Sequence, residues 1–189
     1  AVIQDLWNVA GKPKIQLIGV ASGPGSFTGL RVGITTAKTL AFAWNAKLIG
    51  INTLEAIADQ IEPVAGWLHV ALDAQRKELF LARFCADGKG WRREASDTII
   101  TLQSWLESLA NSTPSHPIAV AGPALVKLQD RLPAQAIVSD STAWHARAGT
   151  VGRLAFQAYQ AGQADELWSL VPHYLRASYA EEKRPATAD

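Results

Sequence analysis

The segment Gly23–Gly29 carries residue types and spacing that could bind a phosphate group. It follows a short apolar run and precedes a long helical pattern, and glycines at such a junction permit positive φ angles and close approach to the backbone. The start of the following helix would supply unpaired N–H groups and partial positive charge. The alternative is a tight turn in which a serine caps the helix. The candidate phosphate-binding residues are Gly23, Gly25, Ser26 and Thr28.

The same segment lacks the features of two catalytic motifs. No Lys-Ser/Thr pair ends it, as a Walker motif requires, and Pro24 stands where a nucleophile elbow needs glycine. The four histidines have no spacing typical of metal ligands. We therefore expect no catalytic residue and no metal site. The histidines are His69, His116, His145 and His173.

Several other polar residues have simple structural interpretations. His69 lies in an apolar strand pattern and is expected in the core. Cys85 lies in a similar pattern, which predicts a buried, unreactive thiol. Asp73 ends a strand and is expected to cap the turn that follows. Arg92 and Arg93 are expected to be solvated surface residues.

Composition limits the class of protein. The chain has 189 residues, and its 18 basic and 17 acidic side chains leave a net charge of +1. This balance gives no support to a nucleic-acid or membrane binder driven by charge, and no run approaches the roughly 18 apolar residues of a membrane span. The single cysteine fits a reducing compartment, so we expect a cytoplasmic protein. Methionine is absent and residues 1–10 resemble the inside of a helix, which predicts that the natural start lies upstream.

The order of apolar patterns predicts two α/β domains. Residues 1–63 read as helix, strand, helix, strand, helix, which implies a parallel or mixed sheet covered by helices. Asn52 is expected to cap the last of these helices. Residues 64–189 form the predicted second domain, with a C-terminal segment that can return to the first. Its expected elements are strands at 67–73, 78–85, 91–99, 118–122 and 136–138 and helices at 102–109, 125–132 and 143–160.

The helix expected after Ser26 has more apolar surface than one packing partner would cover. Between Ser26 and Ala46 only Arg31 and Lys38 are charged, and nearly every other direction is apolar or small. A surface helix of a single domain needs one apolar stripe. The second partner could be another part of this chain or a second protein. We favour a second protein, because the helix at 1–10 also has surplus apolar residues, including Trp7.

Residues Ser22–Ala41 closely resemble the signature of the bacterial TsaB (YeaZ) family, accessory subunits in threonylcarbamoyladenosine modification of tRNA. Weaker matches follow in the family's order at Gly50–Ile57, Leu72–Phe80 and Val171–Ser178. The resemblance implies an actin/Hsp70-like (ASKHA) α/β fold of two subdomains with mixed sheets flanked by helices. The family's N-terminal strands and their Asp-Thr-Ser/Ala turn are absent here, and Lys77 stands where the family usually has glycine.

The resemblance also implies a role. Family members are non-catalytic scaffolds that pair with the transferase TsaD through their first helices and form homodimers with the same surface. TsaD would supply the metal and the chemistry, the ATPase TsaE would bind the pair, tRNA would be contacted only indirectly, and ATP or ADP would bind only in the assembled complex. No peptidase activity is expected. The implied interface residues are Trp7, Phe27, Leu30, Arg31, Ile34, Ala37, Lys38 and Ala41.

A second hypothesis comes from the glycine-rich segment. A protein of the same fold could act alone as an ATPase or phosphotransferase, with Gly23–Gly29 as its phosphate cradle.

Overall fold

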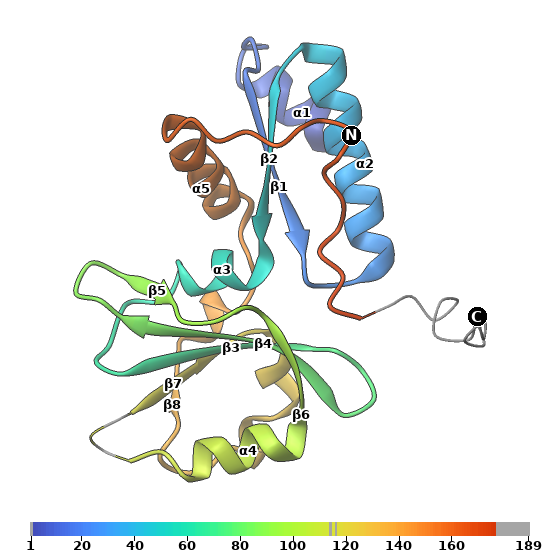
Figure 1. The fold of residues 1–189 in the computed structure, drawn as a ribbon. Helices are drawn as coiled ribbons and strands as arrows, with labels where there is room; N and C mark the ends of the chain where they lie inside the picture. Colours follow the sequence, from blue (N-terminus) through green and yellow to red (C-terminus); the bar gives the residue numbers. More distant parts are fainter. Residues whose placement is uncertain (1, 114, 116, 177–189) are drawn as a thin grey trace, which may run out of the picture.

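Two β-sheets organise the chain, one above the other in Figure 1. The computed structural model describes residues 2–113, 115 and 117–176. The upper sheet consists of β1 (Leu17–Gly23) and β2 (Lys47–Asn52), which pair in parallel and are connected by α2 (Phe27–Trp44). This is the strand–helix–strand order that the sequence predicts. An α/β fold with helix-covered sheets follows.

Helices cover both faces of the upper sheet. Ile18 and Val20 of β1 pack with Leu48 against α2, whereas their neighbours in the strands pack against α5 (Ala148–Gln160). The approach of α5 is close, because a Cβ on Gly19 would lie 2.7 Å from the Cβ of Ala155. Strands with a helix packed on each face explain the continuous apolar runs in the sequence.

The position of α5 corrects the predicted domain division. The sequence predicts a second domain at 64–189, but α5 packs on the first sheet, where Val151 and Ala155 join the cluster of Ile49 and Ile51. The chain after α5 also lies against the first sheet, since Asp165 N donates to the Leu48 carbonyl at 2.9 Å. The first unit therefore contains both α1 (Val2–Val9) and α5, together with the chain that directly follows α5.

The second unit is a mixed six-stranded sheet. Its strand order is β5-β4-β3-β7-β8, with β6 also paired to β4. One face packs on α3 (Thr53–Ala58) and the other on α4 (Leu102–Ala110). The strands are β3 (Trp67–Asp73), β4 (Glu78–Ala86), β5 (Trp91–Arg93), β6 (Thr98–Thr101), β7 (Ile118–Ala121) and β8 (Ile137–Val138).

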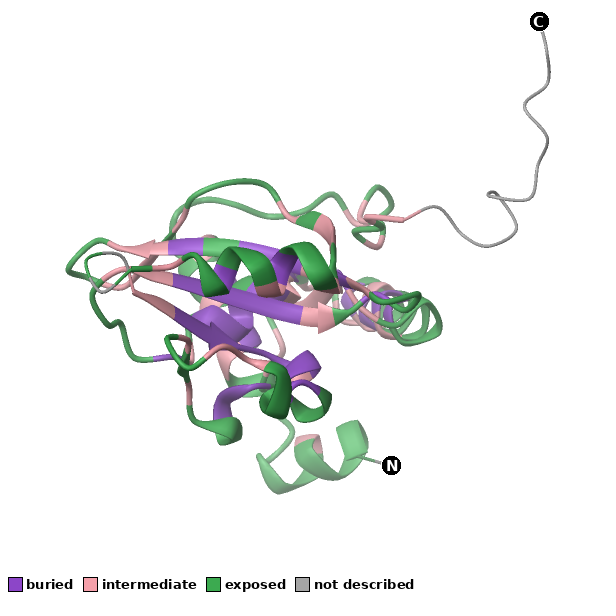
Figure 2. Ribbon diagram, turned by 90° about the horizontal axis from the view of Figure 1, so that it is seen from below, coloured by how far each residue is buried: buried purple, intermediate pink, exposed green. Residues whose placement is uncertain are grey.

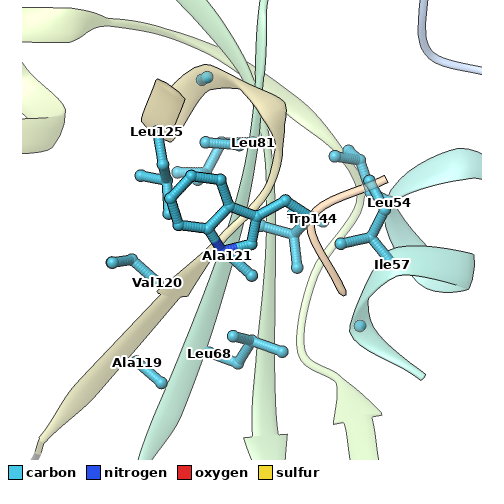
Figure 3. Close-up of a cluster of buried hydrophobic side chains, with 14 of the residues drawn as sticks. Leu54, Ile57, Leu68, Leu81, Ala119, Val120, Ala121, Leu125 and Trp144 are labelled. Atoms are coloured by element: carbon cyan, nitrogen blue, oxygen red, sulfur yellow. The ribbon is translucent and has the colours of Figure 1, made fainter. Parts of the chain in front are cut away.

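Some expected elements are shorter or different. The strand at 91–99 is divided into β5 and β6, and the helix at 125–132 is two 3₁₀ segments, η1 (Pro123–Lys127) and η2 (Gln129–Arg131). The helix at 143–160 begins only at Ala148, after η3 (Ser141–Ala143). Its expected first turn is absent because Trp144 enters the core beside Leu125 and Leu81 (Figure 3). Core packing overrides helix propensity here.

The N-terminal helix α1 (Val2–Val9) packs only lightly. It has no buried residue, and the ring of Trp7 contacts that of Trp44 with centroids 6.0 Å apart. Figure 2 shows α1 exposed at the N-terminus while strands of the second sheet are buried at the centre. Within the described ranges, no helix has the length and apolarity needed to cross a membrane.

Candidate functional site

The glycine-rich turn joins β1 to α2 and is shaped by its own chain. Ser26 caps α2, with its Oγ accepting the Gly29 N–H at 3.3 Å, so the capping prediction is confirmed. Gly23 has φ +114°, and a Cβ there would lie 2.9 Å from the carbonyl oxygen of His173. The inner side of the turn is therefore filled by the described chain after α5, residues 161–176, which we call the C-terminal segment. Thr28 and Ser26 lie at the surface and Gly25 is half-buried, and phosphate binding stays a prediction.

Four of the expected interface residues are buried inside the chain. Leu30, Ile34, Ala37 and Ala41 have 8%, 3%, 5% and 1% of their surfaces exposed. Ala37 and Ala41 pack with Leu48, and Leu167 and Leu170 of the C-terminal segment lie against the same cluster. In this conformation the four side chains contact their own chain, and their contact with another protein stays a prediction. Their apolar surface is covered by the first sheet and by the C-terminal segment.

The charged stripe of α2 also binds the C-terminal segment. Arg31 Nε donates to the Tyr174 hydroxyl at 3.1 Å, and its guanidinium lies 4.3 Å from the centre of the Phe27 ring. Phe27 stacks on Tyr174 with centroids 5.0 Å apart. Lys38 Nζ donates to the Trp168 carbonyl at 3.0 Å. One of the two partners that α2 requires is thus an extended segment of its own chain, which runs along the helix in Figure 1.

An apolar surface on α1 and α2 remains uncovered. Phe42 of α2 is 68% exposed although its ring lies 5.8 Å from that of Trp168, and Val32 is 61% exposed. On α1, all four aliphatic side chains are at least half exposed. We call these six residues the α1–α2 surface: Val2, Ile3, Leu6, Val9, Val32 and Phe42. Of the residues first expected at an interface, Trp7 lies on α1 itself and Phe27 is 40% exposed at the start of α2, and both remain predictions.

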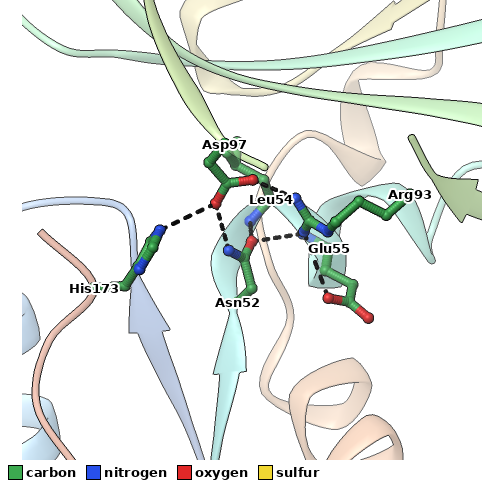
Figure 4. Close-up of polar contacts among 6 residues, drawn as sticks. All are labelled: Asn52, Leu54, Glu55, Arg93, Asp97 and His173. Carbon is green, nitrogen blue, oxygen red and sulfur yellow. Dashed lines mark hydrogen bonds and ion pairs between the residues drawn. The ribbon is translucent and has the colours of Figure 1, made fainter. Parts of the chain in front are cut away.

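A buried carboxylate joins the two units, and the sequence did not reveal it. The side chain of Asp97 is 2% exposed and forms an ion pair with Arg93. Its other oxygen accepts from Asn52 Nδ2 at 2.5 Å and lies 3.5 Å from His173 Nε2 (Figure 4). Asn52 at the same time caps α3, accepting the Leu54 N–H at 2.9 Å, as expected. Asp97 therefore holds the end of β2 and the C-terminal segment against the second sheet.

Arg93 departs from the expectation of a solvated side chain. It is 27% exposed, its guanidinium lies 4.9 Å from the centre of the Phe84 ring, and one nitrogen is 3.5 Å from Glu55. Arg92, by contrast, is 58% exposed, as expected. The alternation of a strand places the two side chains on opposite faces. The sequence context does not distinguish the two arginines, because both precede the same acidic loop, and only the strand geometry does.

The remaining polar candidates have structural roles. Asp73 Oδ1 accepts the Gln75 N–H at 2.8 Å, which confirms the capping prediction. His69 is buried as expected, and burial, aided by the charge of Arg83, lowers its pKa from 6.5 to about 4. Cys85 is half-buried rather than buried, and its sulfur lies 3.0 Å from an Arg92 nitrogen. His116 lies outside the described residues. In the part of the chain that the structure describes, no three His, Cys, Asp or Glu residues are grouped to hold a metal ion.

Comparison with known proteins gives a consistent set of relatives. Residues 2–122 match the family model "TsaD: tRNA N6-adenosine threonylcarbamoyltransferase". The tRNA threonylcarbamoyladenosine biosynthesis protein TsaB of Bacillus subtilis is 30% identical over 170 residues, which are 88% of this chain and 72% of that protein. The Escherichia coli protein of the same name is 32% identical over 104 residues, 52% of this chain and 45% of that protein. The structure of YeaZ from Pseudomonas aeruginosa superposes with a TM-score of 0.73 at 25% identity, covering 92% of this chain and 80% of the other.

Proposed function

Because this chain belongs to the TsaB (YeaZ) family, we propose that it is a non-catalytic subunit that binds and activates a TsaD-type transferase. The family acts in the biosynthesis of threonylcarbamoyladenosine in tRNA. The proposal adds to this a mode of action: the chain presents a docking surface, and the partner supplies the metal and the transferase chemistry. ATP or ADP would bind only in the assembled complex. A TsaE-type ATPase would bind the pair, and tRNA would be held by the complex as a whole.

The observation that carries the proposal is the α1–α2 surface. On α1, Val2 is 81%, Leu6 68% and Val9 87% exposed. Because these aliphatic side chains remain exposed, the helix gains little stability from packing on its own chain. Val2, Leu6 and Val9 are spaced four and three residues apart and so share one face of α1, and exposed apolar patches of this kind mark sites of protein association. A transferase subunit that buries them would replace the missing packing. A second copy of this chain could use the same surface in a homodimer.

The rival hypothesis, an independent ATPase or phosphotransferase, has less support. Ser26 Oγ is engaged as the α2 cap, and the backbone of His173 occupies the inner side of the turn at Gly23. A phosphate there would have to displace the C-terminal segment or bind on the outer side. The scaffold role requires neither change.

The test measures association of the purified chain with a TsaD-type subunit from the same source by size-exclusion chromatography with light scattering. We expect a heterodimer for the unmodified chain. Leu6→Glu and Val32→Glu should each weaken it by about 30-fold or more, because a charge would be buried without a partner. Both side chains are well exposed, so the variants should fold normally.

Val126→Glu is the matched control. Val126 is 66% exposed, close to the 68% of Leu6, but it lies on η1 of the second unit. Its association should be unchanged. Equal association of all variants would contradict the proposed surface. ATP hydrolysis by the chain alone would instead favour the rival hypothesis.

A further inference from the structure

A hollow of about 450 Å³ lies on the second unit beside the C-terminal end of α4. Trp67 and Ile118 form apolar parts of its wall. His69 and Arg83, which lie opposite each other in the antiparallel β3–β4 pair, also line it. Its size is typical of small-molecule sites in proteins. Neither the α1–α2 surface nor the glycine-rich turn contributes a residue to it.

His69 presents a free hydrogen-bond donor to this hollow. Only 6% of the residue is exposed, and its Nδ1 accepts from Trp105 Nε1 at 3.3 Å. Because Nδ1 of a neutral ring is then the acceptor, the ring proton is on Nε2. Nε2 has no hydrogen-bond partner among the described residues. Every fully buried side-chain nitrogen or oxygen of these residues has such a partner, so Nε2 is not fully buried. Nε2 must therefore reach the hollow that His69 lines.

The protonation state of His69 supports this geometry. Burial, with a smaller contribution from Arg83, lowers the pKa of His69 to about 4. At neutral pH the ring is uncharged, so it donates one hydrogen bond from Nε2 and remains an acceptor for Trp105. The donor is therefore present throughout the range in which a carboxylic acid is ionised.

Arg83 adds a cation without a partner. Its side chain is exposed and makes no ion pair or side-chain hydrogen bond with any residue that the structure describes. None of the described residues lining the hollow is acidic. A guanidinium beside an N–H donor, with no competing acid, is complementary to a carboxylate, whose two oxygens accept charge-assisted hydrogen bonds.

We propose that this hollow binds a small monocarboxylate with an apolar body. The carboxylate oxygens accept from the Arg83 guanidinium and from His69 Nε2, and the apolar body contacts Trp67 and Ile118. The site is independent of the proposed docking surface, because it lies on a different unit and uses none of the same residues.

The test compares two probes of similar shape, benzoate and benzamide, on the whole ¹⁵N-labelled chain. Binding is followed through the chemical shifts of backbone amides and tryptophan indole N–H groups. We expect benzoate to shift residues around the hollow, the Trp67 indole among them, and benzamide to bind about tenfold more weakly because it lacks the charge. Equal affinity for both probes, or benzoate shifts confined to other regions, would overturn the proposal.

Two charge-neutralising variants complete the test. Arg83→Gln should weaken benzoate binding by about tenfold and leave the fold intact, because the side chain is exposed. Arg131→Gln is the control: it removes the same charge from an exposed arginine of the same unit that does not line the hollow. Its benzoate affinity should match that of the unmodified chain. An equal loss in both variants would show a general charge effect and would refute the site.

Discussion

His173 Nε2 lies 3.5 Å from Asp97 Oδ2, and this contact joins the C-terminal segment to the second sheet (Figure 4). A second anchor of the segment to this unit is Arg176, which donates to the Ala74 carbonyl at 2.7 Å and forms an ion pair with Glu78. The same segment packs on α2 through Tyr174. One stretch of chain thus connects α2, which carries part of the proposed docking surface, with the turn between β3 and β4.

Replacing Asp97 should destabilise the protein. In Asp97→Asn, Arg93 loses its buried ionic partner and one of the two accepting oxygens becomes a donor, so we expect the free energy of unfolding to fall by about 2 kcal/mol or more. Urea denaturation measures the change. Glu94→Gln is the control, because Glu94 pairs with the exposed Arg92 and its loss should cost less than about 0.5 kcal/mol. Equal stability of the two variants would contradict the role assigned to Asp97.

Two alanines of α2 should respond differently to the same substitution. Ala41 is 1% exposed against Leu48, so Ala41→Arg should destabilise the monomer by about 3 kcal/mol or more through overpacking and burial of charge. Ala43 is exposed on the same helix, and Ala43→Arg should change stability by less than about 0.5 kcal/mol. Thermal unfolding of both variants measures the difference. Similar melting temperatures would mean that α2 is not packed as described.

The turn between β3 and β4 should accept glycine well. Lys77 has φ +60° and follows two further residues with positive φ, a conformation that costs side chains with a Cβ about 1 kcal/mol or more. Lys77→Gly should therefore be neutral or stabilising by up to about 1 kcal/mol. Lys77→Val should be destabilising, because a β-branched side chain tolerates this region poorly. Chemical denaturation of the pair tests the turn, and a more stable valine variant would contradict its geometry.

The burial of His69 should make stability depend on pH. Because its folded pKa, about 4, is below the ordinary 6.5, the unfolded chain binds more protons between these values. The contribution of His69 to the free energy of unfolding is therefore fully present above pH 6.5 and declines as the pH falls towards 4. The loss should reach about 2 to 3 kcal/mol at pH 4.5.

The measurement is the free energy of unfolding between pH 7.5 and 4.5. His69→Gln, whose amide oxygen can still accept from Trp105, should lack this part of the slope. If both proteins lose stability in parallel, protonation of His69 is not the cause.

The sequence by itself determined the type and order of most elements and the caps that begin them. Ser26 and Asn52 are recognisable as helix caps because their hydrogen bonds reach only two or three residues ahead. The antiparallel pair β3–β4 is also recognisable, because its two strands follow each other directly in the sequence. The match of Ser22–Ala41 to the TsaB family likewise rests on contiguous residues, and the comparisons bear it out.

Only the tertiary structure decided what covers α2. Apolar periodicity shows that a face must be buried but does not identify its partner, and so it does not reveal that Leu30, Ile34, Ala37 and Ala41 are covered by their own chain. The partner is a segment more than a hundred residues later, with little regular secondary structure and no periodicity of its own. The role of Asp97 is not visible in the sequence for the same reason, because two of its partners, Asn52 and His173, come from distant segments. Local hydrogen bonding leaves a pattern in the sequence, whereas contacts between distant segments exist only once the chain has folded.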